Sequence, residues 1–237
     1  MDREAWRERL LRAADARTRA TAVRVRRELA RFAAEAADAG QFTDAVEHRQ
    51  RLEAILTAEA SATALRFGAF GQRMLREARE FDIALAFRIQ VAEWVRRIAP
   101  ERARRIADRS QQAVTDTLAQ AALEGVGEAE TARRLRAEVG GTLARSRART
   151  IARTEVGAAQ NVALILIADD AGLRVRRQWL ANEDSRTRPT HAAADGQIIE
   201  PGERFRVGSA HLAHPSDPNG PAREVINCRC TVLLLPD

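Results

Sequence analysis

Hydrophobic residues recur every three or four positions through the first 124 residues, which is the period of an amphipathic helix. Residues 1–39 predict one long, arginine-rich helix that stops at Gly40, and Thr43 is a candidate N-cap for the next helix. The clearest stripe comes later, at spacings of four, four, three and four: Ile83, Phe87, Val91, Trp94 and Ile98. This half of the sequence therefore predicts a helical bundle or an extended helical arm.

Three residues in this region are expected to limit the helices. Glycine is unfavourable inside a helix, so Gly68 and Gly71 predict an interruption of the second one. Proline lacks the backbone N–H that a helix interior needs, so Pro100 predicts the end of the third helix or the start of the next. His48 lies alone among these helices, and we expect it at the surface.

From Gly127 onward the pattern of hydrophobic and polar residues changes. Glu128–Val139 predicts a short helix, Gly140-Gly141 a break, and Thr142–Asp170 a long helix that Gly172 closes. After it, alternating residues predict short strands. The expected segments are a strand at 173–179, a two-turn helix between Pro189 and Gly196, a hairpin-like pair at 197–200 and 205–207, a loop at 208–221 and a last strand from Ile226.

These elements predict an α+β protein. A helical N-terminal region, residues 1–124, would precede a small domain, residues 125–237, in which a few antiparallel strands pack on the Thr142–Asp170 helix.

Composition adds two constraints. Aromatic residues make up only 4% of the 237 residues, so alanine and aliphatic side chains must fill the core. All 39 basic residues are arginine, and the net charge is +6, which permits non-specific contact with DNA. The 33 acidic residues are interspersed among the arginines, so the sequence indicates no single basic patch. The candidate DNA-facing residues lie around the Gly140-Gly141 break: Arg133, Arg134, Arg136, Arg145, Arg147 and Arg149.

The start of the sequence lacks the apolar stretch of a signal peptide. The longest apolar run, Val162–Ala168, is far shorter than the ~20 residues that cross a bilayer. We therefore expect neither secretion nor a membrane partner.

The residues able to do specific chemistry gather between Trp179 and Cys230, which hold three of the four histidines and both cysteines. One interpretation is a zinc site, with candidate ligands His191, Asp195, Cys228 and Cys230. Paired zinc cysteines usually have two to four residues between them, whereas only Arg229 separates these. Free cysteine is also often buried as a small hydrophobe, so we predict two reduced thiols, at least one of them facing the core, without metal or cofactor.

Enzyme chemistry is the second interpretation. Cys228 or Cys230 with His191 could form a nucleophile pair, and Asp184 with Asp195 could act as acid and base. No local motif enforces either geometry, so we predict no enzyme. A third interpretation explains more, namely a polar cluster that holds the small domain together through paired charges. Its members would be Glu155, Asp184, Arg186, Arg188, His191, Asp195, Asn227 and Arg229.

Glu155 connects this cluster to the long helix. It falls on one helical stripe with Ile151, Ala159, Val162 and Leu166, a stripe that should be buried. Because a buried carboxylate is costly unless it is paired, we predict that Glu155 is mostly buried and contacts an arginine or a backbone N–H beyond Trp179.

These same segments resemble a known family. The sequences I-A-R-T-E-V-G-A-A-Q-N (Ile151–Asn161), W-L-A-N-E-D-S-R-T-R-P-T-H-A-A-A-D-G-Q (Trp179–Gln197) and R-E-V-I-N-C-R-C (Arg223–Cys230) stand in the order of the phage Mu F-like minor head proteins, also called phage head morphogenesis proteins. The likeness extends over about residues 127–237, and the N-terminal helices carry no motif of that family.

The resemblance implies a structural virion component, made in the bacterial cytoplasm and placed at the portal vertex or inside the capsid. It implies a role in head assembly and in DNA packaging or delivery, with portal or major capsid protein as partners and several copies per virion. It implies no reaction. The alternative is a metal-dependent or thiol enzyme that acts on nucleic acid. We assign docking on portal or capsid to residues 1–124.

Overall fold

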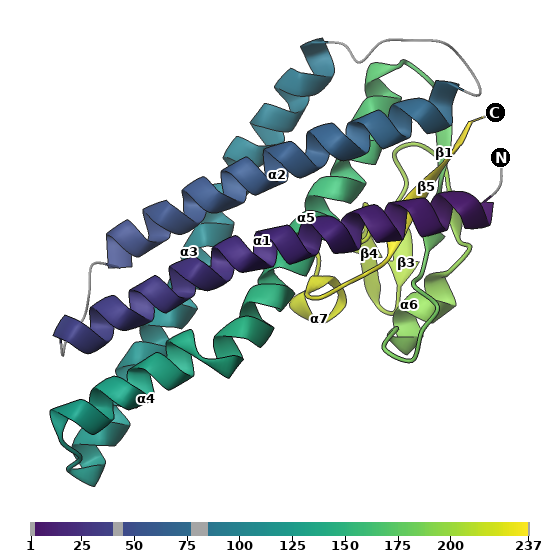
Figure 1. The fold of residues 1–237 in the computed structure, drawn as a ribbon. Helices are drawn as coiled ribbons and strands as arrows, with labels where there is room; N and C mark the ends of the chain where they lie inside the picture. Colours follow the sequence, from purple (N-terminus) through teal and green to yellow (C-terminus); the bar gives the residue numbers. More distant parts are fainter. Residues whose placement is uncertain (1–2, 40–44, 77–84, 237) are drawn as a thin grey trace. The chain divides into compact units, whose positions relative to one another are not determined.

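A computed structural model describes residues 3–39, 45–76 and 85–236 (Figure 1). The predictions about Gly40, Thr43 and Ile83 lie outside these residues. Five long helices come first: α1 (Arg3–Ala39), α2 (Ala45–Arg76), α3 (Leu85–Glu124), α4 (Glu128–Gly140) and α5 (Thr142–Asp170). Shorter elements follow: β1 (Val175–Leu180), α6 (Pro189–Ala194), β2 (Ile198–Ile199), β3 (Phe205–Val207), β4 (Ala210–Leu212), α7 (Ala222–Val225) and β5 (Thr231–Pro236). The predicted α+β class is confirmed.

The glycines expected to interrupt α2 do not do so, and that prediction was wrong. α2 runs unbroken through Gly68 and Gly71. A Cβ at Gly68 would lie 2.3 Å from Cζ of Phe87, and one at Gly71 would lie 2.5 Å from Cγ2 of Ile167. Both glycines therefore serve close packing against other helices, for which a missing side chain matters more than helix propensity.

Pro100 also fails to end a helix, because it lies inside α3. Residues on both sides of it, Val95, Ala99 and Ala103, are buried, so tertiary burial outweighs the lost backbone hydrogen bond. The buried stripe differs slightly from the predicted one. Phe87 and Val91 are buried, but Trp94 is only half-buried.

The strands form two small antiparallel sheets. β1 lies in the middle of a three-stranded sheet of order β2-β1-β5, and β3 pairs with β4. The predicted hairpin was therefore wrong, since β2 and β3 belong to different sheets and the true hairpin is β3–β4. The side chain of Gln197 bridges the gap instead, accepting a hydrogen bond from the Arg206 N–H (2.7 Å) and donating to its carbonyl (3.3 Å).

The described residues group into two compact units, and each contains segments from both sides of the predicted boundary near residue 124. The first, here called the sheet unit, comprises Met1–Thr18, Glu59–Val95 and Arg153–Asp237. The second, the helical unit, comprises Arg19–Ala58 and Arg96–Ala152.

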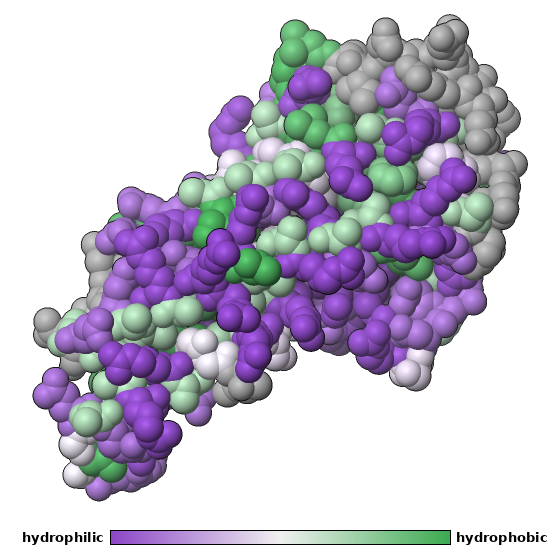
Figure 2. Space-filling model, viewed as in Figure 1, coloured by the Kyte–Doolittle hydropathy of each residue, from purple (hydrophilic) through white to green (hydrophobic). Residues whose placement is uncertain are grey.

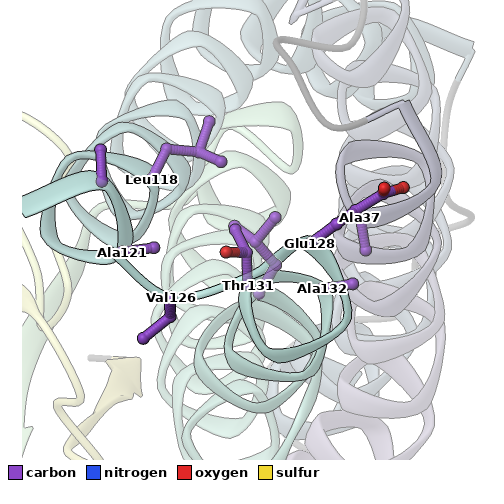
Figure 3. A pocket seen from close by; sticks show the side chains of 9 residues that line it. Ala37, Leu118, Ala121, Val126, Glu128, Thr131 and Ala132 are labelled. Atoms are coloured by element: carbon purple, nitrogen blue, oxygen red, sulfur yellow. The ribbon is translucent and has the colours of Figure 1, made fainter. Parts of the chain in front are cut away.

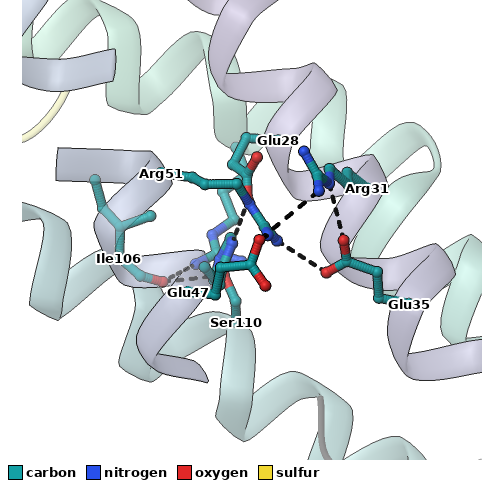
Figure 4. A network of polar contacts seen from close by, with 9 residues as sticks. Glu28, Arg31, Glu35, Glu47, Arg51, Ile106 and Ser110 are labelled. Atoms are coloured by element: carbon teal, nitrogen blue, oxygen red, sulfur yellow. Dashed lines mark hydrogen bonds and ion pairs between the residues drawn. The ribbon is translucent and has the colours of Figure 1, made fainter. Parts of the chain in front are cut away.

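The helical unit contains a buried polar network (Figure 4). Arg51 Nε donates to Glu28 (2.8 Å), and Arg51 also pairs with Glu35 (2.8 Å) and Glu47. His48 is fully buried, stacks on Phe32 at 4.0 Å and lies 2.8 Å from Glu28, so its predicted surface position was wrong. A charged neighbour and an aromatic ring allow this histidine to enter the core.

The same unit has an open hollow of about 320 Å³ between the end of α3 and α4 (Figure 3). Small and aliphatic side chains line most of it, including Leu118, Ala121 and Val126, and Glu128 is its one carboxylate.

One stretch, Glu128–Asp170, includes a window long and apolar enough by composition to cross a membrane. In the structure 72% of that window is buried, as in a core helix.

The contact at Gly68 yields a test of the packing. Replacing an interior helix glycine by alanine ordinarily stabilises a protein by about 1 kcal/mol. Here Gly68→Ala should instead lower the free energy of unfolding by about 1–3 kcal/mol, because the methyl group would overlap the buried ring of Phe87. Denaturant unfolding measures this change. The double variant Gly68→Ala/Phe87→Leu should lose less than the sum of the single changes, and a stabilising Gly68→Ala would contradict the contact.

Candidate functional site

The centre of the polar cluster is a meeting of one histidine and both cysteines. Pro189 begins α6, which places His191 in the first turn of that helix, facing inward. Cys228 and Cys230 lie in the irregular segment between α7 and β5. The prediction of a strand beginning at Ile226 was wrong, because α7 and the left-handed conformation of Asn227 (φ 61°) delay β5 until Thr231.

The turn directs both sulfur atoms at the same imidazole nitrogen. His191 Nδ1 lies 3.3 Å from Cys230 Sγ and 3.6 Å from Cys228 Sγ. The exposed fractions are 2% for His191, 2% for Cys228 and 5% for Cys230. The prediction that at least one thiol faces the core is therefore confirmed, and both are buried.

Glu224 completes this group from the other side of the ring, and the sequence interpretation missed it. Its Oε2 lies 3.2 Å from His191 Nε2, close enough for an ion pair though not aligned as a hydrogen bond. Thr190 Oγ1 donates to the same oxygen (2.9 Å). Glu224 is itself buried, so a carboxylate faces the imidazole inside the core.

The thiols are electrostatically unequal. The hydrogen bond with Cys230, followed by His191, holds the pKa of Cys228 well below its ordinary value. The same hydrogen bond and burial raise the pKa of Cys230. The Cys230 backbone N–H also points to Cys228 Sγ at 3.4 Å, so negative charge in this pair is favoured on Cys228.

Ion pairs and backbone contacts surround this centre. The guanidinium of Arg229 hydrogen-bonds Asp184 and holds the pKa of that carboxyl well below its usual range. Asp184 also accepts from the Arg186 N–H (2.9 Å), and Arg188 donates to the Ile226 carbonyl (2.6 Å). The structure thus brings these predicted residues around the turn that carries the cysteines.

Asp195 does not join the histidine and cysteines. It follows the end of α6 and accepts a hydrogen bond from the Ala181 N–H (2.8 Å). Among the described residues, the group of metal-ligand types in mutual reach is His191, Cys228 and Cys230. Asp195 is thereby removed from the zinc candidates.

The long helix α5 connects to the cluster through Thr154 and Arg153. Glu155 is partly buried, with less than about a third of its surface exposed, which agrees with the predicted mostly buried position. The helical face turned to the cluster begins one residue earlier, where Thr154 Oγ1 accepts from the Asn227 N–H (2.9 Å). Arg153 donates to the Asn227 side chain (2.7 Å).

Asn161 is the most connected of these helix residues and is fully buried. Its Oδ1 accepts from the Val232 N–H (2.8 Å) and from Thr231 Oγ1 (3.2 Å). Its Nδ2 lies within hydrogen-bond reach of the carbonyls of Gly157 (2.8 Å), Pro215 (3.1 Å) and Cys230 (3.4 Å). Asn161 and its neighbour Gln160 were quoted in the family motif above, yet no spacing rule marks them as core polar residues.

A compact loop, residues 213–220, packs on the same helix. Buried Asp217 accepts from the N–H groups of Ala213 and Asn219, both at 2.9 Å. Gly157 allows close approach, because a Cβ there would lie 2.7 Å from Ser216 Oγ. His214, in the same loop, is buried away from solvent, and burial lowers its pKa.

The candidate DNA-facing arginines lie in the helical unit, and at least four of the six are engaged there. Arg133 and Arg134 pair with Glu130, Arg136 pairs with Asp38 (2.6 Å), and Arg147 donates to the Ile106 carbonyl (2.8 Å). Arg145 and Arg149 are exposed.

With this geometry in view, comparison with known proteins is informative. Residues 112–233, about half of the chain, match the family described as Phage Mu protein F like protein. The chain belongs to this family. The matched region contains every residue of the His191, Cys228, Cys230 and Glu224 group, and the predicted resemblance is confirmed. No solved structure matches.

Two curated relatives share only part of their length with this chain. The "NAD(+)--arginine ADP-ribosyltransferase EFV" of Enterococcus faecalis is 37% identical over 90 residues, which are 37% of this chain and 18% of that protein. The "Minor head protein GP7" of Bacillus phage SPP1 is 32% identical over 97 residues, which are 40% of this chain and 32% of that protein. The chain therefore spans less than a third of either relative.

The contacts of Asn161 predict a large effect of its removal. Asn161→Ala would leave the Val232 N–H and several carbonyls buried without their partner. Each orphaned group costs about 1–3 kcal/mol, so we expect the variant to lose roughly 2–5 kcal/mol of unfolding free energy. Asn219→Ala, at an exposed asparagine, is the matched control and should change it by about 0.5 kcal/mol or less. Equal effects in denaturant unfolding would show that the Asn161 network is not structural.

Proposed function

We propose that this protein is a minor component of a phage head that docks on the portal vertex or the inner capsid surface during head assembly. Family membership and the likeness to the minor head protein of phage SPP1 support this proposal. In it, residues 1–124 make the principal contacts with portal or capsid subunits, and residues 125–237 form the region common to the family.

The observation that carries the proposal is an asymmetry in exposed hydrophobic side chains. Among the described residues, six of the seven large hydrophobic side chains that are exposed lie before residue 125. They are Val23, Val46, Leu65, Leu85, Ile89 and Leu123, and only Ile198 lies beyond. The long helices otherwise present hydrophilic side chains with small apolar ones between them (Figure 2).

Single exposed hydrophobics are ordinary on any protein, but their concentration in one region favours partner contacts there. Leu123 is the most exposed of them, at 83%, and it follows Ala122, which lines the hollow between α3 and α4. The family match begins at residue 112, so most of this region lies outside the part shared with relatives.

An enzymatic role is less well supported. A nucleophilic thiol must reach its substrate, whereas Cys228, Cys230 and His191 are each no more than 5% exposed. The transferase relative shares only 18% of its length with this chain, which leaves most of that protein without a counterpart here. We therefore assign a structural role.

Contact with packaged DNA would be secondary in this proposal. Arginines that already pair with Glu124, Glu130 or Asp38 have part of their charge neutralised. Exposed arginines of this corner, such as Arg149, would support only weak, salt-sensitive and sequence-independent binding.

Photo-crosslinking during assembly tests the docking surface with the full chain. A photoreactive residue is placed singly at Val23 or Leu123, with Ile198 as the matched exposed control. We expect Val23 and Leu123 to crosslink to portal or major capsid protein, which mass spectrometry distinguishes, and Ile198 not to do so. Crosslinking from Ile198 alone would place docking in the C-terminal region and overturn the division of roles.

Charge substitution gives a second measurement. Val23→Asp and Leu123→Asp remove apolar surface at exposed positions, so each should change stability by about 0.5 kcal/mol or less while lowering the number of copies per head. Ile198→Asp should leave the copy number unchanged. Normal incorporation of Leu123→Asp and Val23→Asp would contradict the proposed surface.

A further inference from the structure

We propose that His191, Cys228 and Cys230 bind one zinc ion. This site is independent of the docking function proposed above, since it lies in the shared family region and not on the N-terminal helices. The three ligand atoms already lie within 4.8 Å of one another, and each side chain is buried. The spacing of the two cysteines in the sequence favoured thiols without metal, but three features of the structure favour a zinc site.

The first reason is the distances. Zinc binds thiolate sulfur at about 2.3 Å and imidazole nitrogen at about 2.0–2.1 Å, so adjacent N and S ligands in a tetrahedron are about 3.6 Å apart. The observed separations from His191 Nδ1 are 3.3 Å to Cys230 Sγ and 3.6 Å to Cys228 Sγ. Little rearrangement would therefore be needed to admit the ion.

The second reason is the support around the ligands. A metal-binding histidine commonly directs its other ring nitrogen to a carboxylate, which fixes the tautomer that leaves the ligating nitrogen free. Glu224 Oε2 lies 3.2 Å from His191 Nε2, an ion-pair contact that a small reorientation would turn into a hydrogen bond, and Thr190 positions the carboxylate. On the sulfur side, the Cys230 N–H points to Cys228 Sγ at 3.4 Å, a contact that stabilises a thiolate.

The third reason removes the objection from spacing. One residue between two cysteines is unfavourable for chelation if the segment is a flat strand. Here a turn at Ile226 and Asn227, with Asn227 in the left-handed conformation, precedes an irregular segment that holds both cysteines, and the Cys230 carbonyl lies near the Asn161 side chain. The turn brings both sulfur atoms to one imidazole nitrogen.

The donor set selects the metal. Two thiolates and an imidazole suit zinc, whereas magnesium and calcium prefer oxygen ligands. The ion would join α6 to the segment that precedes β5. The three protein ligands leave one further coordination position, which a water molecule can fill.

Metal analysis of the intact chain tests the proposal. The full-length protein is purified without chelators from cells grown with added zinc, and its zinc content is measured by elemental mass spectrometry. We expect about one zinc ion per chain. After chelator treatment, Co²⁺ should restore a stoichiometric complex with thiolate-to-cobalt charge-transfer bands and the strong d–d bands of a tetrahedral site.

Substitutions then assign the ligands. Cys228→Ser, Cys230→Ser and His191→Gln should each abolish stoichiometric binding, while His211→Gln, at an exposed histidine of the same unit, should retain it. Glu224→Gln should bind zinc about 10–100-fold more weakly in competition with a chromophoric chelator, because it perturbs only the support of His191.

The wild-type Co²⁺ spectrum decides the outcome even if a ligand variant fails to fold. Absence of both zinc and thiolate–cobalt bands in the wild type would overturn the site. So would a disulfide between Cys228 and Cys230 in protein kept under reducing conditions, or full metal content in the cysteine variants.

Discussion

The sheet unit depends on one buried side chain, Asn161, which hydrogen-bonds backbone groups of three different segments. It accepts from the Val232 N–H and lies within reach of the Cys230 and Pro215 carbonyls, so one amide serves α5, β5 and the 213–220 loop at once. Buried backbone groups without partners are costly, and small irregular segments have many of them. Gly157, one turn earlier on α5, leaves room for the loop to approach. The amide and the glycine together explain how so short a set of strands can be held on a helix.

The same constraint orders the residues of the candidate site. Because the Cys230 carbonyl is held at Asn161, the turn that carries both thiols is fixed on α5. His191 lies on α6, and the buried carboxylate of Glu224 lies on α7. Trp179 closes the group with an edge contact to His191 at 5.5 Å. This chain has few aromatic residues. Polar contacts between its helices and strands therefore provide much of the stabilisation that large buried side chains provide in other proteins.

The sequence predicted local features well, above all the ends of helices. Glycine and proline marked the bounds of α4, α5 and α6, since those residues act through backbone geometry that needs no distant partner. Predictions failed where a distant partner decides the outcome. Gly68 stays helical because of Phe87, and His48 is buried because of Glu28 and Phe32. The cluster around Asp184 and Arg229 could be anticipated from charge pairing. Asn161 and Glu224 could not, because Asn161 mainly contacts backbone groups and Glu224 contacts a histidine and a threonine, which no charge pattern in the sequence indicates.

The first helix links the two parts of the proposed function. Its early residues belong to the sheet unit, where Arg7 donates to the Ala181 carbonyl and pairs with Glu183, both at 2.6 Å. Those two residues lie in the segment that leads from Trp179 to the Asp184–Arg229 pair. Later residues of the same helix, including Leu29 and Phe32, belong to the core of the helical unit. A helix that contributes to both cores cannot be removed without exposing apolar surface in each. The proposed docking region, residues 1–124, and the rest of the chain therefore share both cores, so surface substitutions are better suited than truncation to separating their roles.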